Sequence, residues 1–159
     1  PANVWKLFAA GQSDAMAGVP EWTVFAMHEA PKMPVEIIPS DTLFKSMAQS
    51  VVVSDEMIRK DPETVRRLVR ATLHGWSDIV ADPEGAAKDY VKLVTEFQDR
   101  EPIIAEVFRM YNKYVYPGQP KPGWIDAGRL AALQEFYLKQ GIIEHTVPVD
   151  DLYTLEFVK

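Results

Sequence analysis

The sequence predicts an α/β fold in which a short strand-rich part precedes a longer helical part. Two apolar segments, residues 14–19 and 35–38, lie on either side of a helix that begins at Pro20, and this order is typical of a βαβ unit with parallel strands. A third segment, residues 46–54, is rich in β-branched side chains. The remaining residues carry helical patterns, and 159 residues are enough for a domain with a real core.

The front of the chain is divided by glycine and proline. A short helix is predicted over residues 4–10, because Gly11 follows it in a position typical of a helix end. The helix from Pro20 is predicted to end near Ala30, since Pro31 cannot continue it. These boundaries leave room for one short strand on each side of the second helix.

The helices of the longer part begin with a common device. Each has a proline in its first turn, where the missing N–H is not needed, and two follow an aspartate that can accept hydrogen bonds from the free N–H groups of that turn. Three helices are therefore predicted to start at Pro62, Pro83 and Pro102. After an irregular, proline-rich connection at 116–124, a further helix is expected at 126–140 and a short amphipathic one in the tail.

Charge and composition exclude several functions. The formal net charge of −6 gives no field that would attract nucleic acid, and the one dense basic run, Arg66, Arg67 and Arg70, is interpreted as the solvated face of a helix. The chain has no cysteine, so disulfides, thiolate catalysis and zinc–thiolate sites are excluded. No apolar run is long enough for a membrane helix.

The sequence gives little support for a catalytic function. Nucleotide-binding, nucleophile and metalloprotease motifs are absent, and the three histidines are far apart. The adjacent Asp150 and Asp151 are explained by the favourable interaction of acids with a helix N-terminus. We therefore predict no catalytic residue, no metal site and no cofactor, and we expect the protein not to be an enzyme.

The segment AGVPEW, residues 17–22, is the strongest candidate for a binding site. Ligands of open α/β sheets bind where strands end and helices begin. There Gly18 would allow a close approach to the backbone, Glu21 could accept a hydrogen bond from an amine or amidine, and Trp22 could stack on a flat or cationic group. The alternative is that Glu21 only complements the helix dipole and Trp22 only packs, and spacing alone does not decide between them.

Three stretches carry a resemblance to a known family. They are LFAAGQSDAMAGVPEW, SVVVSDEMIRKDPETVRRLVRATLHGWSDIVADPEGAAKDYV and VPVDDLYTLEFV. Together and in this order they resemble substrate-binding proteins of ABC transporters, in the group that includes carriers of thiamine-pyrimidine precursors, taurine and aliphatic sulfonates. The resemblance covers nearly the whole chain, but only the C-terminal half of such proteins.

The resemblance implies part of a type II periplasmic-binding-protein fold. Residues 1–40 would form the βαβ portion of the second lobe, 41–55 the hinge or crossover strand, and 56–159 a mainly helical portion that returns to the first lobe. It also implies that the protein is periplasmic, or extracellular with a lipoprotein anchor, and that a closed, ligand-bound form docks on a membrane permease. Self-association is expected, because half of the fold would be missing.

The resemblance also implies ligand contacts and a ligand class. Gly18, Glu21 and Trp22 would face the cleft between the lobes, and Ser40, Asp41 and Gln49 would lie near the crossover. An acid and an aromatic ring favour an amino-substituted ring, such as an aminopyrimidine, or an amine over a sulfonate. Two alternatives stay open: an enzyme similar to the yeast thiamine-pyrimidine synthase, whose cysteine-rich motif is absent here, and a sensory ligand-binding domain.

Overall fold

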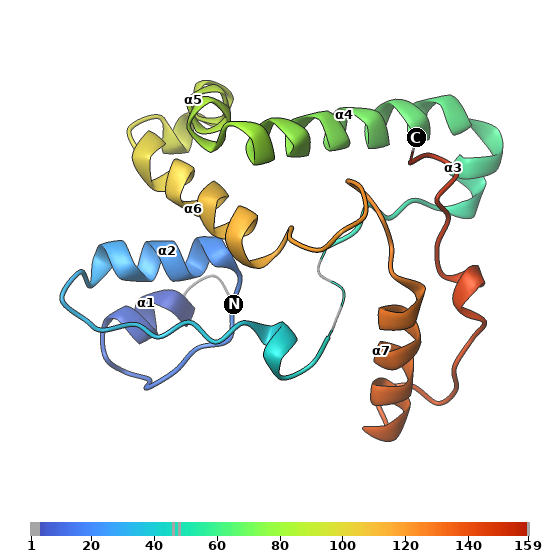
Figure 1. Ribbon diagram of the computed structural model, residues 1–159, viewed down its shortest axis with the longest axis horizontal. Helices are drawn as coiled ribbons and strands as arrows, with labels where there is room; N and C mark the ends of the chain where they lie inside the picture. The colour runs from blue at the N-terminus through green and yellow to red at the C-terminus, as the bar shows by residue number, and fades with distance from the viewer. Residues whose placement is uncertain (1–3, 46, 48, 159) are drawn as a thin grey trace. The chain divides into compact units, whose positions relative to one another are not determined.

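The computed structural model describes residues 4–45, 47 and 49–158 of the chain. The chain divides into two compact units, each built from two separate stretches of sequence. Pro1–Ile37 and Ser77–Pro117 form the first unit, and Ile38–Trp76 and Gly118–Lys159 form the second. Helices make up the regular structure of both (Figure 1).

The first unit is a group of packed helices. Helix α2 contacts both α1 and α6, and α6 contacts α5 (Figure 1). The helices of this unit are α1 (Val4–Ala9), α2 (Pro20–Glu29), α5 (Pro83–Leu93) and α6 (Glu101–Tyr114), with a 3₁₀ turn η2 at Thr95–Phe97.

The core of the first unit lies between α5 and α6. Ala87 and Val91 of α5 are buried against Ile104 and Ala105 of α6. Small side chains at the centre let the two helices approach closely, and Phe97 and Phe108 pack around this centre. In α2, Val24 and Ala26 are also buried, and because residues two apart point in roughly opposite directions, this agrees with the packing of α2 against both α1 and α6.

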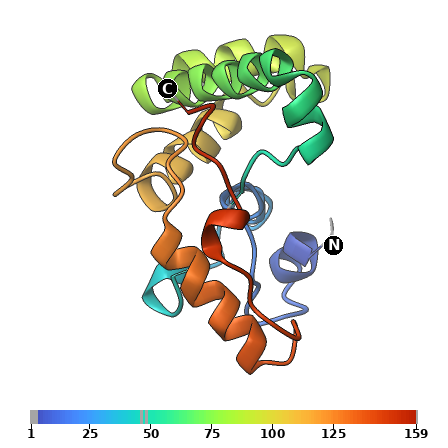
Figure 2. The ribbon, with the colours of Figure 1, turned by 90° about the vertical axis from the view of Figure 1, so that its right-hand side faces the viewer.

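The second unit is more open. Val65 of α4 and Phe157 of the tail are its buried apolar side chains among the described residues. The 3₁₀ turn η3 lies beside α7, as Figure 2 shows. The elements of this unit are η1 (Ser40–Thr42), α3 (Asp55–Lys60), the part of α4 (Pro62–Ala81) before Ser77, α7 (Ala127–Lys139) and η3 (Val149–Asp151).

Local capping signals predicted the helices well. The carboxylate of Asp82 accepts a hydrogen bond from the Gly85 N–H at 3.0 Å, and that of Asp61 accepts one from the Thr64 N–H at 3.1 Å. The helices expected from Pro20, Pro62 and Pro83 begin at those residues, so these predictions are confirmed. The amphipathic helix expected in the tail is reduced to the short turn η3.

The predicted α/β class is wrong. No β-strand occurs in the described part of the chain, and the segments 14–19 and 35–38 are irregular, so there is no βαβ unit. Of the third predicted strand, 46–54, Ser46 and Ala48 lie outside the described residues, and the rest is irregular too. A strand needs a neighbour for its backbone hydrogen bonds, and β-branched composition alone does not supply one.

The crossover strand expected at 41–55 is also absent from the described residues. Its start belongs to the turn η1, and Asp55 begins helix α3, which the sequence analysis did not predict. Helix α3 begins here because the hydroxyl of Ser54 accepts a hydrogen bond from the Met57 N–H at 3.2 Å. None of the described helices is both long and apolar enough to cross a membrane. The division at 40 and 55 remains a prediction.

Candidate functional site

The six predicted ligand contacts are divided between the two units. The first unit contains Gly18, Glu21 and Trp22, and the second contains Ser40, Asp41 and Gln49. Gly18 and Gln49 are exposed, whereas Glu21 and Trp22 are half-buried. The N-terminal turn of α2 therefore brings together the three residues of the AGVPEW segment and leaves them partly accessible.

The start of α2 is set by its backbone. Val19 has extended φ and ψ angles of −108° and 161°, and Pro20 occupies the first turn. No side chain caps this end of the helix. Glu21 in the first turn supplies a negative charge close to the N–H groups that point out of the helix, which is favourable.

Glu21 is bound to the neighbouring helix. The hydroxyl of Tyr111 in α6 donates a hydrogen bond of 2.7 Å to Oε2 of Glu21. The other carboxylate oxygen, Oε1, has no hydrogen-bond partner among the described residues. A half-buried carboxylate with one oxygen engaged and the other open can accept a hydrogen bond from a ligand N–H.

The pKa values of two tyrosines are raised by burial and by this carboxylate. Burial raises the pKa of the Tyr111 hydroxyl well above its usual range, and the hydrogen bond to Glu21 adds to the effect. Burial also raises the pKa of Tyr116, with a further contribution from the charge of Glu21. The two rings lie 5.5 Å apart between centroids. Both hydroxyls therefore stay protonated at neutral pH, and the Tyr111 proton is the one donated to Glu21.

Trp22 is positioned by Gly18. A Cβ atom added to Gly18 would lie 3.0 Å from Cε3 of the indole, so the ring packs closely against the glycine backbone. Gly18 has a negative φ, so this close contact, rather than backbone conformation, is what favours glycine here. The first turn of α2 thus carries a carboxylate and an indole at adjacent positions, and the carboxylate is bonded to the first of two neighbouring phenols.

Sequence reasoning missed both tyrosines. Tyr111 lies 90 positions from Glu21 in the chain, and no motif links the two residues. It also missed a second link between the same helices, in which Nε2 of His28 lies 2.8 Å from Oε2 of Glu106. Tyr111 lies within α6 and Tyr116 lies two residues after its end, so the packing of α6 against α2 brings Tyr111 to Glu21.

In the second unit, Asp41 forms an ion pair. Its two carboxylate oxygens accept hydrogen bonds of 2.8 and 2.6 Å from the guanidinium of Arg129 in α7. The hydrogen bond from Arg129 lowers the pKa of Asp41. A ligand at Asp41 would therefore share this carboxylate with Arg129. Ser40 lies beside it in η1, and no side-chain contact of Ser40 or Gln49 points to a ligand.

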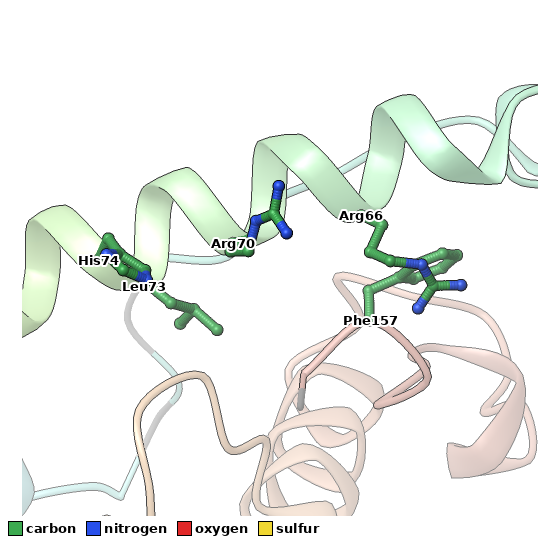
Figure 3. Close-up of a pocket in the computed structure, with 5 residues that line it drawn as sticks. All are labelled: Arg66, Arg70, Leu73, His74 and Phe157. Atoms are coloured by element: carbon green, nitrogen blue, oxygen red, sulfur yellow. The ribbon is translucent and has the colours of Figure 1, made fainter.

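The basic run has a more specific environment than a solvated face. Arg66 and Arg70 line a pocket of about 290 Å³ together with Leu73, His74 and Phe157 (Figure 3). By contrast, the described residues hold no group of three or more histidine or acidic side chains placed to bind a metal ion.

Comparison with known proteins assigns the family. A family model described as "NMT1/THI5 like" matches residues 2–86, which is more than half of the chain. The chain belongs to the NMT1/THI5-like family. The family part of the predicted resemblance is therefore confirmed. The NMT1/THI5-like match includes all six predicted ligand contacts, whereas Tyr111 and Tyr116 lie beyond it.

A curated relative of this NMT1/THI5-like chain is the riboflavin-binding protein RibY of Chloroflexus aurantiacus. It is 26% identical over 129 residues, which cover 78% of this chain and 36% of the relative. The chain thus spans little more than a third of the length of that protein. No solved structure matches the chain.

Proposed function

We propose that this chain is part of a solute-binding protein that captures a small organic molecule for an ABC importer. The family assignment supports binding, and so does the name of the relative, a riboflavin-binding protein. The observation that carries the proposal is the first turn of α2, which bears the half-buried carboxylate of Glu21, with one oxygen not hydrogen-bonded to a described residue, and the half-buried Trp22 at the next position. It has the features of a ligand site, with apolar rings and few polar groups.

The proposed ligand is a flat nitrogen heterocycle or an amine. Trp22 would stack on the ring, and Glu21 would accept a hydrogen bond from a ring N–H or an amino group. The single proton of the Tyr111 hydroxyl is already donated to Glu21, so Tyr111 would offer a ligand only its oxygen as an acceptor, and the ring of Tyr116 lies next to it. An aminopyrimidine meets these requirements, and so does the flavin ring that the relative's name suggests.

The proposal also includes a membrane permease as the partner and a location outside the cytoplasmic membrane. Ligand binding would favour a closed form of the protein, and a membrane permease would recognise this form. The protein would act outside the cytoplasmic membrane. Ser40, Asp41 and Gln49 remain proposed ligand contacts of the second unit. Substitution of each by alanine and measurement of ligand affinity would test them one at a time.

Calorimetric titration tests the proposed function. The purified chain is titrated with riboflavin, an aminopyrimidine and taurine, and each ligand is recovered and identified by mass spectrometry. We expect one of the nitrogen heterocycles to bind and to be recovered unchanged. The Glu21→Gln variant should bind it about tenfold more weakly, because a charged hydrogen-bond acceptor is replaced by a neutral one.

Three results would contradict the proposal. Binding of taurine alone would point to a sulfonate carrier, conversion of a ligand into a product would point to the enzyme alternative, and binding of none of them would remove the support for a solute site. An unchanged affinity of Glu21→Gln would contradict only the assignment of Glu21.

A further inference from the structure

We infer that the pocket between α4 and the C-terminal tail is a binding site for the phosphate group of a small organic molecule. It lies within the second unit and is independent of the proposed heterocycle site. Arg66, Arg70 and His74 line it at intervals of four residues, so they lie on one side of α4 (Figure 3). Side chains with N–H groups thus follow one another along the helix.

Arg66 is held in place by its neighbours. Its guanidinium lies 5.3 Å from the centre of the Phe157 ring, and Figure 3 shows the two side chains together. Its Nε is 3.2 Å from Glu63, and its Nη2 is 3.9 Å from Glu156. These contacts fix the plane of the guanidinium, so little conformational entropy is lost when an anion binds to it.

Arg70 has no such partner. It is exposed and makes no hydrogen bond or ion pair with a described residue, so its guanidinium can turn toward a ligand. Neither acid near Arg66 lines the pocket, whose polar lining is two arginines and a histidine. Because Arg66 shares its charge with Glu63 and Glu156, Arg70 supplies the positive charge of the lining that is not already paired.

The shape and lining of the pocket favour an organic phosphate over the free ion. Its volume of about 290 Å³ is close to the lower limit of about 300 Å³ for small-molecule pockets. Leu73 and Phe157 give it apolar walls beside the cations, and Phe157 is almost fully buried. Arginine binds phosphate through paired hydrogen bonds, while Leu73 would contact the apolar part of the ester.

Binding of phenyl phosphate and inorganic phosphate tests this site. Both are titrated into the whole chain at constant ionic strength, and the arginine Nε–H signals are followed by NMR. We expect both to bind, phenyl phosphate more tightly, and the Arg66 and Arg70 signals to shift. Arg70→Gln should weaken binding by about tenfold, since one charge-assisted hydrogen-bond donor is lost.

Arg67→Gln is the matched control. Arg67 lies on the same helix and carries the same charge, but it donates a hydrogen bond to Thr64 and does not line the pocket. It should change the affinity by less than about threefold, as expected for screened surface charge. Equal losses of affinity in Arg70→Gln and Arg67→Gln would mean nonspecific attraction and would overturn the site. The absence of binding, or of any shift of the Arg70 signal, would also overturn it. Circular dichroism would verify that each variant folds.

Discussion

The Tyr111 hydroxyl donates a 2.7 Å hydrogen bond to the Glu21 carboxylate and so links α6 to the first turn of α2. This contact engages one oxygen of a half-buried acid and leaves the other without a hydrogen-bond partner among the described residues. Its position depends on packing between helices that are distant in sequence. The stability of the first unit and its proposed ligand site therefore depend on the same residues.

Tyr111→Phe should destabilise the chain by about 1–2 kcal/mol, because the half-buried carboxylate loses a hydrogen-bond donor. Urea unfolding followed by circular dichroism would measure the loss. Tyr114→Phe is the control, since Tyr114 lies in the same helix and makes a cation–π contact that does not use its hydroxyl. Equal stability of Tyr111→Phe and the wild type would show that the hydrogen bond contributes nothing.

Alkaline pH should weaken the first unit. The pKa values of Tyr111 and Tyr116 are raised in the folded chain above the ordinary value of about 10. Their contribution to stability is therefore complete below pH of about 10 and is lost as the pH rises through the folded pKa values. Ultraviolet titration of the wild type and of Tyr111→Phe would show this, because the variant lacks the tyrosinate signal of Tyr111. In the wild type, that signal should appear above pH of about 10. A Tyr111 signal centred at the ordinary pKa would contradict the prediction.

Gly18→Ala should reduce ligand affinity severalfold with little loss of stability. The new methyl group would approach Cε3 of Trp22 to 3.0 Å, so the indole must move by a few tenths of an ångström. Gly75→Ala is a useful comparison, because a methyl group there meets nothing within 4 Å. It should leave affinity unchanged and raise stability by about 0.5–1 kcal/mol, as alanine does within helices. Unchanged affinity in Gly18→Ala would show that the packing of Trp22 against Gly18 does not contribute to ligand binding.

The chain should self-associate through exposed apolar side chains. Leu43, Val52 and Leu93 are 80%, 86% and 86% exposed. Sedimentation velocity at rising protein concentration should show dimers or larger species, because burial of such side chains is favourable. The double variant Val52→Lys, Leu93→Lys should shift the chain toward monomer.

Ser50→Lys is the control for that double variant. It adds positive charge at an exposed polar position and should not change association. A wild-type chain that stays monomeric throughout would contradict the prediction, and so would an equal shift in the control.

Local signals explain what the sequence could predict. The starts of α4 and α5 depend on Asp61, Asp82 and the prolines that follow them, all within one turn. The choice of the AGVPEW segment depends on a strand that ends where the Pro20 helix begins; the start of the helix is confirmed, whereas the strand is absent from the described residues. Propensity and spacing are sufficient where the interacting residues are neighbours in the chain.

Distant contacts explain what the sequence could not predict. The strands expected at 14–19 and 35–38 depended on partners that spacing cannot provide, and they are absent from the described residues. Tyr111 reaches Glu21, and Arg66 reaches Phe157, only through packing between distant segments. Each of these residues, read alone, is an ordinary helical or tail residue.

The affinity of Trp22→Ala for riboflavin and for an aminopyrimidine tests the central claim most directly. Trp124→Ala is the matched control, because Trp124 is not one of the proposed ligand contacts and its ring makes a cation–π contact with Lys121. The proposed site predicts that Trp22→Ala binds the heterocycle at least tenfold more weakly, or about 1.4 kcal/mol, and that Trp124→Ala binds it like the wild type. Wild-type affinity in a folded Trp22→Ala chain would contradict a ligand site at the start of α2.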